Sequence, residues 1–231
     1  MRPRICRLGE ETWVVEFEPQ LDPLTNDRVL AMARAMDRRK LAGVLDVVPA
    51  IASLAVHVDG DLIDEDVLSA TLDRLADVRP EPESPRASHD VPVCYEGTYG
   101  PDLEAVADWS GCSASEVIAR HIATEYRVFM IGFLPGFAYL GTVDDRIAAP
   151  RRAAPRLKVP AGSVGIAGRQ TGVYPIESPG GWQIVGRTPI GMFDPLRRPP
   201  VRMQAGDRVR FVPIDPTEFA RLAASQEGAF R

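Results

Sequence analysis

Cysteine is scarce in this sequence, and the other marks of a secreted or membrane-bound chain are scarce too. The three cysteines, Cys6, Cys94 and Cys112, are odd in number and widely spaced, which argues against a disulfide framework and a zinc site. We expect them to be small buried hydrophobic residues. No apolar run is long enough to span a bilayer, and acidic residues follow the basic start, residues 1–5, where a signal core would lie. The expected location is cytoplasmic.

A basic stripe and a phosphate-binding loop are also missing. The formal net charge is -5, and arginines are interspersed with acidic residues, so nucleic acid is not an expected partner. Eight glycines fall between Gly162 and Gly191, but none is followed by Lys-Ser or Lys-Thr, and no G-x-G-x-x-G opens a helix after a strand. If ATP is used, we expect another chain to bind it.

A serine hydrolase and a metal enzyme find little support. The segment around Ser163 resembles a nucleophile elbow, but the last histidine, His121, precedes that serine, whereas an α/β-hydrolase needs it afterwards. The order His121, then Asp144 or Asp145, then Ser163 or Ser178 stays available, because a triad is defined by geometry. The chain's histidines are too scattered to predict a metal site.

Periodic patterns predict a small α+β domain over residues 1–80. Short apolar runs predict strands at residues 4–8, 12–17, 44–48 and 53–58. Helical spacing predicts one helix over residues 26–39 and a second helix capped by Asp64. Residues 81–90 combine prolines with alternating charges, which break every periodic pattern and predict a solvated linker.

The second domain, residues 91–231, begins with mixed elements and then loses helical periodicity. We expect strands over 91–95 and 126–131, and helices over 102–109, 113–121 and 216–224. From Pro150 onward, short apolar pieces alternate with turns, which predicts a closed or nearly closed β-barrel. The predicted fold class is therefore α+β.

Glycine, proline and aromatic residues concentrate between His121 and Pro189, which predicts a shaped binding surface. The aromatics Phe133, Phe137 and Tyr139, with Trp182, would form an apolar patch large enough to favour a partner protein. The predicted substrate or partner surface comprises Phe133, Pro135, Gly136, Phe137, Tyr139, Gly168, Thr171, Ser178, Gly180, Gly181, Trp182 and Arg187.

Four residues are candidates for catalysis. His121 is interpreted either as a structural histidine at the edge of a helix's apolar face or as a proton carrier at the mouth of the barrel. Arg156, between Pro155 and Pro160, could clamp a carboxylate or phosphate with a guanidinium on a stiff loop. Gln170 and Tyr174 place neutral polar groups among glycines, as a small polar substrate requires.

Nine segments then occur in a recognisable order. They are Val91–Tyr95, Tyr99–Leu103, His121–Gly141, Pro155–Arg156, Val159–Val164, Gly168–Pro175, Ser178–Trp182, Gly186–Pro189 and Gly206–Asp207. Together they resemble the family of 5-oxoprolinase B subunits, also known as allophanate hydrolase subunit 1, which includes the sporulation-kinase inhibitor KipI. The resemblance covers essentially the whole chain.

The resemblance implies that the second domain is a cyclophilin-like β-barrel and that the chain is one part of a hetero-oligomeric enzyme. The implied partners are the C subunit, a related barrel protein, and the A subunit. The three together would open 5-oxo-L-proline to L-glutamate as an ATP-dependent lactam hydrolase, with ATP bound by one of the other two proteins. On this interpretation His121 moves protons, Arg156 holds the substrate carboxylate, and the Phe133–Tyr139 loop lies at the interface.

Two alternatives follow from the same family. The chain could inhibit a sporulation-type histidine kinase, as KipI does, which needs only an apolar docking surface. It could instead be one half of the carboxyltransferase in a biotin-dependent urea carboxylase or allophanate-type system, in which case biotin is the cofactor.

Overall fold

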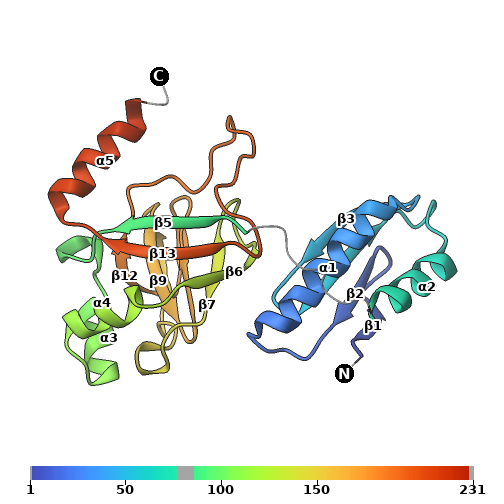
Figure 1. Cartoon of the computed structure of the whole chain (residues 1–231), viewed down its shortest axis with the longest axis horizontal. Helices are drawn as coiled ribbons and strands as arrows, with labels where there is room; N and C mark the ends of the chain where they lie inside the picture. Colours follow the sequence, from blue (N-terminus) through green and yellow to red (C-terminus); the bar gives the residue numbers. More distant parts are fainter. Residues whose placement is uncertain (1, 78–85, 229–231) are drawn as a thin grey trace. The chain divides into compact units, whose positions relative to one another are not determined.

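The computed structural model describes residues 2–77 and 86–228, and it divides the chain into two compact units, residues 1–85 and 86–231 (Figure 1). Of the predicted linker, residues 81–85 lie outside the described residues. Its last three residues belong instead to strand β5, Ser88–Val93. That strand is polar at its start, and it forms because parallel pairing with residues 208–213 satisfies its backbone.

The first unit is a four-stranded sheet with two helices. Its elements are β1 (Arg4–Arg7), β2 (Thr12–Glu16), α1 (Pro23–Arg39), β3 (Val44–Pro49), β4 (Ser53–Val58) and α2 (Glu65–Leu75). The strands are antiparallel in the order β1-β2-β4-β3. Helix α1 begins three residues before the predicted residue 26, because Asp22 caps it through Thr25 and Pro23 occupies its first turn. Both helices pack on one core, in which Met32, Leu54 and Leu72 are buried.

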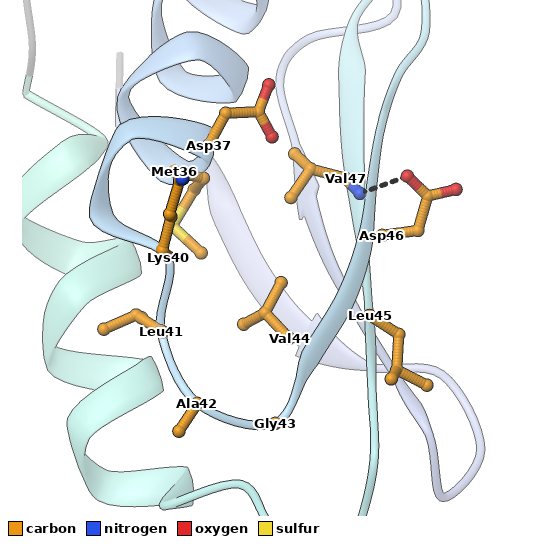
Figure 2. A pocket seen from close by; sticks show the side chains of 10 residues that line it. All are labelled: Met36, Asp37, Lys40, Leu41, Ala42, Gly43, Val44, Leu45, Asp46 and Val47. Carbon is orange, nitrogen blue, oxygen red and sulfur yellow. Dashed lines mark hydrogen bonds between the residues drawn. The ribbon is translucent and has the colours of Figure 1, made fainter.

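Strand β3 forms one edge of this sheet and borders a shallow cavity. The cavity, about 460 Å³, lies where α1 ends and β3 begins, and its lining runs from Met36 to Val47 (Figure 2). The side chain of Asp46 accepts a hydrogen bond of 2.8 Å from the backbone N–H of Val47. A register shift between Val44 and Asp46 interrupts the pairing with β4, which is a common way to protect an edge strand. No residue of the predicted site lies in this unit.

The second unit is a nearly closed barrel, which confirms the predicted α+β class. Its strands are β5, β6 (Tyr126–Ile131), β7 (Ala138–Gly141), β8 (Arg156–Val159), β9 (Ser163–Ala167), β10 (Gln170–Val173), β11 (Ser178–Gly180), β12 (Gln183–Arg187) and β13 (Arg208–Pro213). Its helices are α3 (Leu103–Ser110), α4 (Ala114–Ile122) and α5 (Pro216–Gly228), with 3-10 turns at Gly97–Tyr99 and Asp145–Ile147. None of the helices in the described ranges has the length and apolar character to cross a membrane.

Seven strands form the barrel in the order β12-β9-β10-β7-β6-β13-β5. The first and last strands meet where Cys94, just after β5, exchanges two backbone hydrogen bonds of 2.8 Å with Arg187 of β12. Cys94 is buried as predicted, whereas Cys6 and Cys112 are partly exposed. Strands β8 and β11 form a separate two-stranded sheet. The curved sheet with its helices is visible in Figure 1.

Side chains alternate between the two faces of the barrel strands. On β10, Val173 joins the large buried cluster inside the barrel, whereas the next residue, Tyr174, joins a smaller cluster on the opposite face. On β7, Leu140 lies inside and Tyr139 packs against the smaller cluster. We call this smaller cluster, built around Phe137, Tyr139, Tyr174 and Trp182, the outer aromatic cluster.

Candidate functional site

The outer aromatic cluster is centred on Phe137. The ring of Phe137 lies 4.8 Å from that of Tyr139, 5.2 Å from Tyr174 and 5.4 Å from Trp182, measured between centroids. The last two contacts are nearly perpendicular, the edge-to-face geometry that aromatic quadrupoles favour. Three of the four aromatic residues of the predicted apolar patch therefore pack with Tyr174 within one chain.

Two glycines let these rings lie directly on the sheet. A Cβ atom at Gly172 would stand 2.7 Å from the carbonyl oxygen of Ala138 and 3.2 Å from the ring of Phe137. A Cβ atom at Gly165 would stand 3.0 Å from Cβ of Trp182. Real Cβ contacts are rarely this close, so these positions exclude larger residues. The glycine run thus serves ring packing, which is a structural reason that the sequence did not reveal.

The exposed part of the predicted apolar patch is smaller than the sequence suggested. Phe137 and Trp182 are 1% and 5% exposed, because they pack against the sheet and against each other. Phe133 is 62% exposed, and its ring meets Phe137 edge-on at 5.6 Å. Phe133 also has a φ of 66°, a left-handed conformation that a bulky residue adopts at a cost of about 1–3 kcal/mol. Of the four aromatic residues in the predicted patch, Phe133 is thus the most exposed, and it lies on a strained loop.

Arg156 does clamp a carboxylate, but the carboxylate belongs to the protein. Its Nη1 and Nη2 atoms donate to Asp102 Oδ2 at 2.8 Å and Oδ1 at 2.6 Å. Arg152 Nη1 donates to the same Oδ1 at 2.9 Å, and the backbone N–H of Ile184 donates to Oδ2 at 2.7 Å. Asp102 is buried, and its position in the chain would let it cap α3. Its side chain makes no cap bond, because it is fully engaged with these donors.

The two tyrosines of the cluster lie within the electrostatic reach of nearby arginines. Burial raises the pKa of Tyr174, while a backbone hydrogen bond from Trp182 and the charges of Arg151 and Arg156 lower it in part. Burial likewise raises the pKa of Tyr139, which Arg151 opposes. Both hydroxyls are therefore neutral donors at neutral pH. The outer face combines apolar rings, neutral hydroxyls and positive charge.

His121 lies on the other side of β10, inside the barrel and not at its mouth. It is fully buried, it stacks on Phe211 at 4.7 Å, and burial lowers its pKa to about 3. Helix α4 turns this residue inward because its buried side carries Val117 and His121, four residues apart. The burial of His121 favours its interpretation as a structural histidine over that of a proton carrier at the mouth of the barrel.

Hydrogen bonds fix the tautomer of His121. Thr171 Oγ1 donates its single proton to the carbonyl of Gly165 at 2.9 Å, so it must accept the N–H of His121 Nε2 at 3.0 Å. Nδ1 of the neutral ring then accepts the hydroxyl proton of Tyr95 at 2.8 Å. Both ring nitrogens are occupied by Tyr95 and Thr171, so no catalytic triad forms with an aspartate and a serine. This excludes the chymotrypsin-like alternative.

The remaining predicted residues are distributed around the barrel. Gly168 lies in the turn between β9 and β10 with a φ of 58°, and Gln170 follows directly at the start of β10. Arg187 donates to the carbonyl of Ala161 at 2.8 Å, which is a structural contact. Gly136 has a φ of 83°, and a Cβ there would meet Phe193 at 3.0 Å; Pro135 beside it is exposed.

The last three predicted residues lie on β11 or directly after it, and two of them contact Tyr174 or Arg152. A Cβ atom at Gly180 would clash with the hydroxyl of Tyr174. The carbonyl of Gly181 accepts the backbone N–H of Arg152 at 2.8 Å. Ser178 is buried on β11, and its Oγ has no hydrogen-bond partner among the described residues. The structure therefore brings together part of the predicted site, around Phe137, Tyr174 and Arg156.

Sequence reasoning missed Asp102 and Tyr95 as organising residues. Both lie within segments that carry the family resemblance, Val91–Tyr95 and Tyr99–Leu103. That location was the available signal, but the contacts themselves span 54 and 26 residues of sequence. Within residues 2–77 and 86–228, no three His, Cys, Asp or Glu side chains gather to hold a metal ion.

A known class of proteins shares this combination of barrel and mixed N-terminal unit. The family profile described as carboxyltransferase domain, subdomain C and D, matches residues 3–203. The urea amidolyase of K. lactis has the same fold, with a TM-score of 0.80 at 20% identity, over 96% of this chain and 15% of that chain.

Closer relatives narrow the class. The 5-oxoprolinase B subunit of Bacillus subtilis (strain 168) is 41% identical over 230 residues, covering 95% of this chain and 96% of that protein. The crystal structure of TTHA0988 is 36% identical, with a TM-score of 0.78 over 88% of this chain, which spans only 40% of that longer chain. The chain belongs to the family of 5-oxoprolinase B subunits.

Proposed function

We propose that the chain is the B subunit of an ATP-dependent 5-oxoprolinase, which acts with the A and C subunits to open 5-oxo-L-proline to L-glutamate. The observation that carries this proposal is the 41% identity to a 5-oxoprolinase B subunit over 96% of that protein's length. ATP is bound by one of the other two proteins, because this sequence contains neither a P-loop nor a dinucleotide-binding fingerprint.

The reaction defines what the subunits must supply. A lactam is a stable amide, and ATP can activate it by phosphorylating its oxygen, after which water opens the ring. Substrate and product both carry a carboxylate at neutral pH, so a site for them needs positive charge beside an apolar wall for the ring carbons. Arg151 and Arg156 lie within electrostatic reach of Tyr174 and its neighbouring rings, and Arg152 binds the same Asp102 oxygen as Arg156.

Roles follow from the two sides of the barrel wall. Tyr174, which directly follows β10, and Arg156 of β8 lie at the outer aromatic cluster, and we propose that they bind the substrate. His121 and Thr171, on the inner face, hold β10 in register through the buried hydrogen-bond chain and do not touch substrate. This division assigns His121 a supporting role in place of proton transfer.

The exposed Phe133 loop is the proposed contact with the C subunit. A large aromatic side chain exposed on a left-handed loop residue is suited to insert into a partner's pocket. The length of TTHA0988 supports a partner, because this chain aligns with 40% of it and a further segment is fused within the same polypeptide.

Reconstitution tests the proposed function. The purified chain is mixed with the A and C subunits, and glutamate release from 5-oxo-L-proline is measured with and without ATP, with urea as the competing substrate. We expect glutamate only when all three proteins and ATP are present. Absence of glutamate from an assembled three-protein complex would contradict the proposal.

A carboxyltransferase is the second candidate, favoured by the description of the matching family profile. Its experiment adds a carboxylated biotin protein and urea to the same complex, and transfer of the carboxyl group to urea would support it. The kinase-inhibitor alternative is tested beside it by histidine-kinase autophosphorylation, which we expect this chain to leave unchanged.

A further inference from the structure

Asp102 organises a pair of arginines and has no capacity left for other chemistry. Its two oxygens accept four hydrogen bonds, from Arg152, from both Nη atoms of Arg156 and from the backbone of Ile184. Its side chain is 4% exposed, whereas those of Arg152 and Arg156 are 34% and 26% exposed. The carboxylate therefore lies behind the guanidinium groups, and solvent reaches the arginines.

The pair keeps unused donors and an excess of charge. A guanidinium has five N–H donors, and Arg156 gives two of them to Asp102, so the others remain for a ligand. Arg152 Nε is buried and has no hydrogen-bond partner among the described residues, and the same is true of Ser178 Oγ. Unpaired buried polar atoms are rare in folded proteins and call for an explanation. Two cations held by one anion leave one net positive charge.

The geometry places this pair beside the outer aromatic cluster. Arg156 lies opposite Gly180 in the pairing of β8 with β11, and Gly180 itself lies directly against the Tyr174 hydroxyl, with no room for a Cβ atom between them. Ser178 lies on the same strand, opposite Val159, which belongs to the outer aromatic cluster. The positive charge of this pair thus lies beside the apolar wall of the outer aromatic cluster.

We propose that Asp102 is a positioning residue, which holds Arg152 and Arg156 as a fixed pair that binds a small carboxylate ligand. This proposal rests on the proposed function, in which the ligand is the carboxylate of 5-oxo-L-proline. A guanidinium anchored from behind loses little freedom on binding, so its remaining N–H groups bind an anion more tightly than those of a free arginine.

The test compares two ligands on the full chain by isothermal titration. 5-Oxo-L-proline carries the carboxylate, and 2-pyrrolidinone is the same lactam without it. We expect wild type to prefer 5-oxo-L-proline at least tenfold, which is the low end for a hydrogen bond to a charged group. Arg152→Gln, which keeps an amide donor for Asp102, should reduce that preference about tenfold. The matched control Arg169→Gln, from the exposed ion pair with Asp145, should keep it.

Further variants separate the effect of the positions of the guanidinium donors from the effect of their positive charge. Arg156→Lys keeps the positive charge but loses the two parallel N–H donors of the guanidinium. It should therefore lose the preference for 5-oxo-L-proline over 2-pyrrolidinone, as Arg152→Gln does. Asp102→Asn should do the same at a temperature where its near-ultraviolet circular dichroism shows a folded barrel. If Arg156→Lys or Asp102→Asn kept the full preference, the positioning role would be refuted.

Three results would overturn the carboxylate assignment. They are the absence of a preference in wild type, a preference unchanged in Arg152→Gln, and binding of inorganic phosphate to wild type that is tighter than binding of 5-oxo-L-proline. Titration needs no turnover, so an inactive three-protein complex with an intact preference would contradict the proposed function alone.

Discussion

The neutral, buried His121 predicts a specific pH dependence of stability. Its pKa is about 3 in the folded protein and about 6.5 in an unfolded chain. Because the folded pKa is the lower one, the imidazole is protonated below pH 6.5 in the unfolded state and stays neutral in the folded state. Stability from this residue is complete above about pH 6.5 and decreases as the pH falls toward 3.

The magnitude follows from the width of that window. One proton gives a slope of about 1.4 kcal/mol per pH unit, so the free energy of unfolding should fall by about 2 kcal/mol between pH 6.5 and pH 5. Lowered carboxylate pKa values, such as those of Glu116 and Asp144, act mainly below this range. Between pH 6.5 and pH 5, the contribution of His121 to the free energy of unfolding can therefore be measured apart from that of these carboxylates.

The assay is urea unfolding at a series of pH values. Replacing Trp13 and Trp109 by Phe leaves the buried Trp182 as the single tryptophan, so its fluorescence reports on the barrel unit. His121→Gln is the comparison, since its amide can donate and accept hydrogen bonds but does not titrate. We expect the difference between the two free energies to be constant above pH 6.5 and to fall by about 2 kcal/mol at pH 5. A constant difference down to pH 5 would refute the buried neutral histidine.

Three further outcomes are expected. Gly172→Ala should destabilise the barrel by about 1–3 kcal/mol in urea unfolding, because the added Cβ meets Ala138 and Phe137, whereas Gly191→Ala has open space. Phe133→Ala should change stability by less than about 0.5 kcal/mol but weaken binding to the C subunit about tenfold or more in surface plasmon resonance, and Leu196→Ala, which is 87% exposed, should change neither. Arg156→Lys in the reconstituted complex should raise KM for 5-oxo-L-proline about tenfold with a smaller effect on kcat. Equal free energies of unfolding for the two glycine variants, equal binding of the two apolar variants, or an unchanged KM would contradict the respective argument.

Local patterns predicted most of the elements but not how side chains meet. Alternation along β10 and the residue that follows it separates Thr171 and Val173 from Gly172 and Tyr174, and this two-residue period can be read without a structure. It does not say which face is inside. The contact of His121 with Thr171 spans 50 residues, and it depends on how α4 packs against the barrel.

The candidate site was predicted in part for the same reason. An arginine between prolines was predicted to clamp the carboxylate or phosphate of a ligand, and the sequence could not show that the carboxylate of Asp102 already binds it. A polar residue at the start of a helix ordinarily caps that helix, and this one points away instead. The glycine-rich stretch was predicted to shape a binding surface, whereas Gly165 and Gly172 make room for aromatic rings of the chain itself.

An obligatory role of this chain in a 5-oxoprolinase is tested most directly by one titration. The A and C subunits are held at fixed concentration with ATP and 5-oxo-L-proline, and glutamate formation is followed as this chain is added. We expect no glutamate without the chain and a rate that rises and saturates at a fixed stoichiometry. A rate that is independent of the added chain, whether zero or constant, would contradict that role.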